Sequence, residues 1–191
     1  EVYNAQLIEP GKMISERRKA FIESFREILQ QMYNAISGQR ETIDCQYDSK
    51  FLENTFEELL AHAEEKDRVL QRSTVGIHRD DLFLKIDEHP AKQFASQGQL
   101  KSLALSLKLA QYEVLRREKK MQPLLLLDDI FDKLDKNRVR QLLELLLQQS
   151  FGQIFITDTD EQRIQDILSK LNTSYCIYLI EEGVATLSHI I

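Results

Sequence analysis

Two adjacent carboxylates, Asp128 and Asp129, follow directly after a run of four leucines that begins at Leu124, just after Pro123. A short apolar run of this kind predicts a β-strand that is buried on both faces. In α/β sheets the carboxyl ends of such strands open into the crevice where ligands bind. In nucleotide hydrolases the first acid of such a pair serves Mg²⁺ and the second orients the attacking water. Taken alone, the pair is equally typical of a buried strand that ends in polar, helix-capping residues.

A second candidate site lies upstream, at Ser96-Gln97-Gly98-Gln99. Ser96 can cap a helix that starts here, and Gly98 lets the backbone approach a ligand closely. The start of a helix presents unpaired N–H groups and roughly half a positive charge, which suits a phosphate. Taken alone, a serine cap followed by glycine favours an ordinary helix start over a binding site.

The composition is typical of a globular protein. The chain has 191 residues, of which 42% are hydrophobic and 29% charged, enough for one large or two small domains. The net charge of −6 argues against a protein that coats nucleic acid non-specifically, although it leaves room for a local basic face. We find no apolar run of membrane-spanning length and no signal-peptide pattern. Cys45 and Cys176 lack metal-ligand spacing, so we expect reduced core thiols and a cytoplasmic protein.

The periodicity of apolar residues predicts a mostly helical first part and an alternation of strands and helices after it. Pro10 and Gly11 indicate a turn. The expected helices span residues 13–36, 51–70, 96–120, 136–149 and 161–171. The expected strands span residues 41–47, 82–86, 124–127, 154–157, 175–180 and 184–190, the last of which would complete a hairpin. The strand–helix alternation implies a parallel sheet with right-handed crossovers.

Several motifs occur in the order found in the second half of ATP-binding-cassette (ABC) ATPase heads of chromosome-maintenance and repair proteins. They are the Ser-x-Gly-Gln helix start, a basic helix, the apolar strand that ends in Asp-Asp, and Leu134-Asp135. More narrowly, the chain resembles the RecF family of recombination mediators. Gly76-Ile77-His78-Arg79-Asp80-Asp81-Leu82 is similar to that family's Gly-x-His-Arg-Asp-Asp-Leu, and Phe94-Ala95-Ser96-Gln97-Gly98-Gln99 to its signature. Gly152-Gln153-Ile154-Phe155-Ile156-Thr157 is similar to its last-strand segment.

The resemblance implies an α/β fold class: the C-terminal half of an ABC-type ATPase head, a mostly parallel sheet with flanking helices, plus a mainly helical lobe. Residues 1–75 would form the helical lobe, and residues 76–191 the part of the head with the signature, Walker B and D-loop. The fit of the lobe rests on residues in the N-terminal part of the chain: Tyr3, Leu7, Gly11, Ile14, Arg17 and Phe21.

The resemblance also implies roles for individual residues. Asp128 would help to hold Mg²⁺, and Asp129 would position or activate the attacking water. Asp135 would belong to the loop that crosses to a second subunit near its nucleotide. The γ-phosphate of ATP held by that other subunit would be contacted by Ser96, Gln97, Gly98 and Gln99. ATP would thus join two subunits into a dimer, and hydrolysis would release them.

The sequence departs from the family pattern in several places. It contains no Gly-x-x-x-x-Gly-Lys-Ser/Thr, and we expect the C-terminal part of a longer protein that on its own binds ATP poorly and is inactive. Asp132-Lys133 replaces the more usual Ser-Glu before Leu-Asp. Asp158 occupies roughly the place of the switch histidine of other cassette ATPases, and the γ-phosphate sensor stays unassigned. Many cassette ATPases have Glu where Asp129 stands, whereas the RecF pattern has Asp-Asp.

Two basic features allow more than one interpretation. For His78 and Arg79 a structural role is favoured, with Arg79 pairing against Asp80, Asp81 or a neighbouring loop; an approach to nucleotide or DNA is the alternative. The helix that follows Ser96 is distinctly basic, which fits either a solvated face or binding to the phosphate backbone of nucleic acid. Its cations are Lys101, Lys108, Arg116, Arg117, Lys119 and Lys120.

By resemblance, the intact protein would be an ATP-gated DNA-binding protein of recombination, replication and repair. It would act at single-strand/double-strand junctions or gapped duplex with the RecR and RecO mediators, as an ATP-dependent homodimer and slow, DNA-stimulated ATPase. One alternative is a Mg²⁺-dependent nuclease or topoisomerase-type site, in which Asp158 and Asp160 bind the metal with Asp129 as a further acid. Another is a non-catalytic interaction module.

Overall fold

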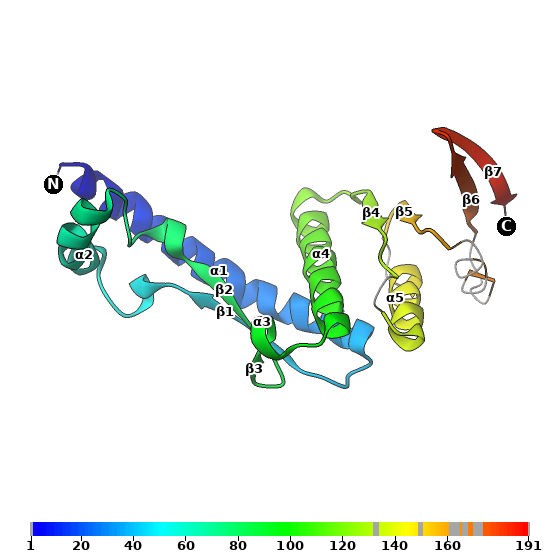
Figure 1. Cartoon of the computed structure of the whole chain (residues 1–191), viewed down its shortest axis with the longest axis horizontal. Coiled ribbons are helices and arrows are strands. Elements are labelled where there is room, and N and C mark those ends of the chain that lie inside the picture. The colour runs from blue at the N-terminus through cyan, green and yellow to red at the C-terminus, as the bar shows by residue number, and fades with distance from the viewer. Residues whose placement is uncertain are drawn as a thin grey trace. The chain divides into compact units, whose positions relative to one another are not determined.

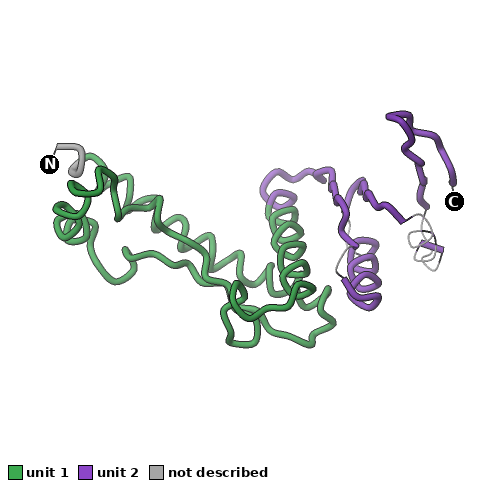
Figure 2. Tube along the Cα trace, viewed as in Figure 1, with its two compact units in different colours: residues 1–114 green, residues 115–191 purple. Residues whose placement is uncertain are grey.

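The computed structural model describes residues 2–131, 134–148, 151–160, 165, 168–169 and 174–190. The chain divides into two compact units, Glu1–Val114 and Leu115–Ile191, which Figure 2 colours green and purple. The lobe boundary expected after residue 75 stays a prediction. The helix expected at residues 161–171 lies almost wholly outside the described residues.

The first unit is built on a long helix and a small antiparallel sheet (Figure 1). Helix α1 (Val2–Ser37) packs along strand β1 (Ile43–Asp48). Strand β1 pairs with β2 (Asp81–Ile86), and β2 with the short β3 (His89–Pro90). The buried side of α1 carries apolar residues at helical spacing: Ile22, Phe25, Ile28, Leu29, Met32, Tyr33 and Ile36.

The turn expected at Pro10 and Gly11 is wrong, because α1 runs straight through both residues. A proline inside a helix removes one hydrogen bond and crowds the carbonyl four residues earlier, a cost of about 3 kcal/mol that the helix bears here. Gly11 is buried, and a Cβ built on it would lie 2.3 Å from Cζ of Phe56. Gly11 therefore serves close packing between two helices rather than a change of chain direction.

Helix α2 (Phe56–Leu70) begins five residues later than expected. The hydroxyl of Thr55 accepts the N–H of Glu58 at 3.3 Å, and the Glu58 carboxylate accepts the N–H of Thr55 at 3.1 Å. This reciprocal capping box fixes the first turn. The preceding residues instead form a short 3₁₀ turn, η1 (Lys50–Leu52). The buried face of α2 joins Val75 in a small core cluster made of Phe56, Leu60, Ala63 and Val75.

A one-turn helix, α3 (Ala91–Phe94), leads into α4 (Gln97–Lys119). Along one side of α4, Leu103 and Ala110 are buried, whereas Leu107 and Val114 are only partly covered. The same side holds two buried serines, Ser102 and Ser106. Each hydroxyl donates to the carbonyl oxygen four residues earlier, at 2.8 Å, so neither polar group is left unsatisfied.

The second unit contains the predicted parallel strands. Strand β4 (Leu125–Asp128) pairs with β5 (Ile154–Thr157) in parallel, and helix α5 (Lys136–Gln148) lies between them in sequence. Strands β6 (Cys176–Glu181) and β7 (Val184–Ile190) form the predicted hairpin. Among the described strands β6 pairs only with β7, so the parallel arrangement extends over two strands rather than the expected three.

The expectation that the leucine run is buried on both faces is wrong. Leu125 and Leu127 are buried, whereas Leu124 and Leu126 are 63% and 67% exposed. The neighbouring Phe155 on β5 is 49% exposed. Side chains alternate between the faces of a strand, and among the residues that the structure describes only one face of the β4–β5 pair is covered. The other face, formed by Leu124, Leu126 and Phe155 and called the open face below, leads toward Asp128.

The two cysteines differ in accessibility. Cys45 is buried in β1, while Cys176 is exposed on β6, so the expectation of a core thiol is wrong for Cys176. Neither cysteine forms a disulfide. Among the helices that the structure describes, none combines the length and the apolar character needed to cross a membrane.

Replacing Gly11 with alanine is expected to lower the free energy of unfolding by about 1–3 kcal/mol, because the new methyl group overlaps the Phe56 ring. At an open helix position the same change would raise stability by up to about 1 kcal/mol. Urea unfolding of Gly11→Ala, Phe56→Leu and the double variant tests this. A clash predicts that Gly11→Ala costs less stability in the Phe56→Leu background; equal costs in both backgrounds would contradict it.

Thiol labelling is expected to distinguish the two cysteines in the 191-residue chain. Burial raises the pKa of the Cys45 thiol, which lowers the fraction of reactive thiolate and also blocks access to it. An aromatic disulfide reagent should therefore modify Cys176 quickly, and Cys45 only when the chain unfolds. Cys45→Ala and Cys176→Ala assign the two phases, and a fast phase that survives Cys176→Ala would contradict the structure.

Candidate nucleotide site

Asp128 and Asp129 meet a third residue, Thr157, at the carboxyl end of the parallel pair. The register places Asp128 directly opposite Thr157. The Thr157 hydroxyl donates to Oδ1 of Asp128, and the backbone N–H of Asp129 donates to Oγ1 of Thr157 at 3.3 Å. Sequence analysis included Thr157 only as the end of the last-strand segment and gave it no role. The available signal was the pairing of two predicted parallel strands that both end in polar residues.

The backbone turns sharply at Asp129, which has a φ of +47°. Asp and Asn occupy this left-handed region more readily than most residues because their short side chains bond locally. The turn ends β4 and buries the next two residues, Ile130 and Phe131. Asp128 and Asp129 themselves remain exposed, so a ligand can reach both carboxylates.

The donor chemistry at Asp128 fits Mg²⁺. Within the described ranges, no group of three or more His, Cys, Asp or Glu side chains could hold a metal ion by itself. Mg²⁺ does not need such a cage, since it commonly binds one or two carboxylates together with substrate phosphates and water. Thr157 takes Oδ1 of Asp128, which makes Oδ2 the oxygen available to a metal.

The segment from Ser96 to Gln99 starts α4, as predicted. Oγ of Ser96 accepts the N–H of Gln99 at 3.2 Å, and Oε1 of Gln99 accepts the N–H of Ser96 at 2.8 Å. This capping box resembles that of α2, and its Gln99 half was not predicted. Ser96 and Gln97 are exposed and Gly98 is half-buried. The first turn of α4 therefore faces solvent with the charge distribution that attracts a phosphate.

Asp135 caps α5. Its Oδ1 accepts the N–H groups of Asn137 and Arg138 at 2.9 and 3.0 Å, and its Oδ2 lies 3.4 Å from Nε of Arg138. Both oxygens thus serve the helix that Asp135 starts, and its role toward a second subunit stays a prediction. Asp132 and Lys133, the departure from Ser-Glu, lie outside the described residues.

The predicted site residues are divided between the two units. Asp128 and Asp129 meet at Thr157 within the second unit. The segment from Ser96 to Gln99 belongs to the first unit. Asp158, proposed as a metal ligand in the nuclease alternative, accepts the N–H of Asp160 at 2.7 Å through its Oδ1. That contact is a local turn in which one of the two acids stabilises the backbone of the other.

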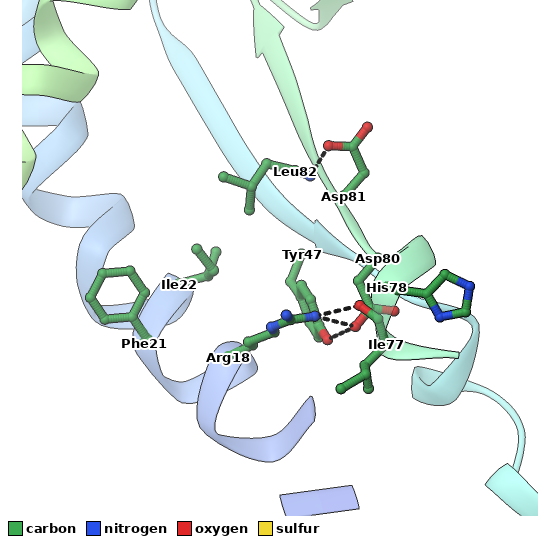
Figure 3. Close-up of a pocket in the computed structure, with 9 residues that line it drawn as sticks. All are labelled: Arg18, Phe21, Ile22, Tyr47, Ile77, His78, Asp80, Asp81 and Leu82. Carbon is green, nitrogen blue, oxygen red and sulfur yellow. Dashed lines mark hydrogen bonds and ion pairs between the residues drawn. The ribbon is translucent and has the colours of Figure 1, made fainter. Parts of the chain in front are cut away.

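The His-Arg-Asp-Asp motif forms part of a network around Asp80 in the first unit (Figure 3). The Asp80 side chain is only 4% exposed, and its Oδ2 lies 3.0 Å from Nη1 of Arg18 on α1. The Tyr47 hydroxyl donates to the same oxygen, and Nη1 of Arg18 also donates to the Ile77 carbonyl at 2.5 Å. A pocket of about 360 Å³, walled by Phe21 and Leu82 among others, lies beside this network.

Arg79 and His78 both lie near the carbonyl of Ser73. Nη2 of Arg79 donates to that oxygen at 3.2 Å, and Nε2 of His78 is 3.4 Å from it. Of the expected partners for Arg79, the neighbouring loop is the one observed, because Asp80 pairs with Arg18. Gly76 has a φ of +135°, and a Cβ on it would come within 2.8 Å of His78. The motif therefore requires glycine here.

Comparison with known proteins supports the motif analysis. No family model matches the sequence. A curated DNA replication and repair protein RecF from Flavobacterium johnsoniae is 44% identical over 177 residues, which is 93% of this chain. RecF from Bacteroides thetaiotaomicron is 40% identical over 96% of the chain. The predicted resemblance to RecF is confirmed. The chain spans about half the length of these curated RecF proteins.

Solved structures agree on the fold. A structure of the recombination mediator protein RecF-ATP in the RecFOR pathway matches with a TM-score of 0.74 and 24% identity, covering 98% of this chain and 50% of that one. A RecF-ATPγS structure matches with a TM-score of 0.72 and 26% identity, covering 97% of this chain and 49% of that one. SMC ATPases share the fold more distantly, with a TM-score of 0.52 and 13% identity, covering 90% of this chain and 88% of that one. The predicted fold class is confirmed.

Replacing Asp80 with alanine is expected to cost about 1–3 kcal/mol of unfolding free energy, because the Arg18 guanidinium and the Tyr47 hydroxyl lose a shared, buried acceptor. The matched control is Asp81→Ala. Asp81 is exposed and accepts its neighbour's N–H, so its loss should stay within about 0.5 kcal/mol. Chemical denaturation measures both changes, and equal losses would show that the Asp80 network does not stabilise the first unit.

Proposed function

We propose that this chain carries the acidic residues and the signature segment of a RecF-like, ATP-dependent DNA repair ATPase. The observation that carries the proposal is the cluster of Asp128, Asp129 and Thr157 at the carboxyl end of two parallel strands. The cluster lies in a chain of which 93% aligns with a RecF protein at 44% identity. Binding of ATP is supported by the RecF-ATP and RecF-ATPγS structures with which the chain shares its fold.

The two acids divide the chemistry between them. Asp128 offers a carboxylate oxygen to Mg²⁺ while Thr157 holds the other oxygen. Bound Mg²⁺ would neutralise charge on the phosphate oxygens. Asp129, exposed one residue later, orients the attacking water and accepts its proton. The strand ends at Asp128, and the turn at Asp129 gives the second carboxylate a different direction of approach.

The γ-phosphate of ATP held by a second copy of the protein would be contacted by Ser96, Gln97, Gly98 and Gln99. Asp135 would lie near the same dimer interface. The exposed first turn of α4 supports this assignment because its N–H groups suit an anion. A phosphate contacted by both subunits favours the closed dimer, and hydrolysis removes that preference. Hydrolysis would be slow and stimulated by DNA.

DNA is the proposed partner of the dimer, at single-strand/double-strand junctions or gapped duplex, together with the RecR and RecO mediators. Support comes from the basic end of α4 and the residue after it, where Arg117, Lys119 and Lys120 are exposed. Such cations bind the phosphate backbone, so affinity would fall steeply with salt. Base-specific contacts are not needed for a structure-selective role.

These activities belong to the whole protein. The sequence holds no Gly-x-x-x-x-Gly-Lys-Ser/Thr, so the loop that cradles the ATP phosphates would come from the half of RecF that this chain does not match. The open face supports the same assignment. Leu124, Leu126 and Phe155 form an apolar surface that the remaining half of the head would cover. In this arrangement residues 1–75 would form the helical lobe.

Sedimentation velocity of the full-length protein that carries this chain tests the proposal. With Mg-ATP, Asp129→Asn should sediment as a dimer, since binding persists while hydrolysis falls by about 10²–10⁴-fold. Ser96→Arg should stay monomeric, because the larger cationic side chain fills the phosphate position.

The matched control is Thr55→Arg, which breaks the equivalent capping box at the start of α2 and should still dimerise. If Ser96→Arg dimerises as well as Thr55→Arg, the signature assignment is wrong. If ATP dimerises no variant and the wild type hydrolyses none, a non-catalytic interaction module is the better description.

A further inference from the structure

Thr157 is connected to both acids, a role that the last-strand segment to which it belongs did not predict. Its hydroxyl has a single proton and donates it to Oδ1 of Asp128. The hydroxyl oxygen, Oγ1 of Thr157, in turn accepts the backbone N–H of Asp129 at 3.3 Å. The directions follow from the chemistry, because an N–H can only donate and the hydroxyl proton is then left for the carboxylate. A single hydroxyl thus links the side chain of one acid to the backbone of the next.

The contact depends on the register of the parallel pair. Leu125 lies opposite Ile154 and Asp128 opposite Thr157, so the two polar residues lie on the same side of the sheet. A shift by one residue would turn every side chain of one strand to the other face and separate the hydroxyl from the carboxylate. The buried residues Leu125 and Leu127 hold the register, because slipping would expose them.

Resting on the proposed function, we propose that Thr157 is a positioning residue for the two acids. By occupying Oδ1, it fixes the plane of the Asp128 carboxylate and directs Oδ2 to the metal. By accepting the N–H of Asp129, it stabilises the left-handed turn from which the second carboxylate projects. Groups that hold a metal ligand in this way commonly change metal affinity or activity by about 10–100-fold when they are removed.

The test uses the full-length protein and two replacements of Thr157. Valine has nearly the same shape and suits a strand, but lacks the hydroxyl. Serine keeps the hydroxyl and loses only a methyl group. Thr157→Val should raise the Mg²⁺ concentration needed for half-maximal ATP hydrolysis by about 10–100-fold, whereas Thr157→Ser should stay within about 3-fold of the wild type.

A second readout separates positioning from a loss of stability. Nucleotide affinity measured in EDTA, without Mg²⁺, should be the same for wild type and Thr157→Val, because the hydroxyl acts through the metal ligand. Thr159→Val is the matched control, since Thr159 is exposed in the same segment and should leave the Mg²⁺ dependence unchanged. Thr157→Ala provides a second variant without the hydroxyl should the valine variant fold poorly.

Each outcome supports or overturns a stated claim. If Thr157→Val and Thr157→Ala keep the wild-type Mg²⁺ dependence while Asp128→Asn and Asp129→Asn abolish hydrolysis, only the positioning role fails. If the two aspartate variants hydrolyse ATP at the wild-type rate, the proposed function is wrong, and the positioning role that rests on it is wrong as well. A shift shared by Thr159→Val would show that the whole segment, and not the hydroxyl, controls the metal.

Discussion

The parallel register between β4 and β5 is the constraint on which the candidate site depends. It holds Asp128 opposite Thr157, and the hydrogen bonds of Thr157 then reach Asp129 as well. Burial of alternate leucines sets this register, so residues that perform no chemistry determine where the acids lie. The site is therefore a consequence of sheet packing, and substitutions in the leucine run that change the register would displace the carboxylates.

A comparable arrangement ties the first unit together. Asp80 lies just before β2, Arg18 on α1 and Tyr47 on β1, and these three residues are far apart in the sequence. Because Asp80 is almost completely buried, its charge needs these partners. The His-Arg-Asp-Asp motif thereby joins the long helix to the sheet.

Much of the architecture could be predicted from the sequence. The apolar periodicity located the helices and strands, and the order of motifs indicated the ABC-type fold. Local chemistry was harder to predict where one residue type has several uses: Gly11 fits a turn as well as a close helix contact, and only the position of Phe56 decides between them. The exposure of Leu126 could not be predicted, because four leucines do not reveal whether a second layer covers them. Predicting the contact of Thr157 with the two acids would have required the register between β4 and β5.

The left-handed backbone at Asp129 sets the direction in which the second carboxylate leaves the chain. Aspartate tolerates this conformation because its short side chain can bond to nearby backbone groups. Glu182, in the turn between β6 and β7, adopts the same φ of +47°, so a longer acid can occupy such a turn as well. A glutamate, which many cassette ATPases have at the place of Asp129, would thus extend its carboxylate by one methylene group from an unchanged backbone. The two acids would then differ in reach rather than in the turn that carries them.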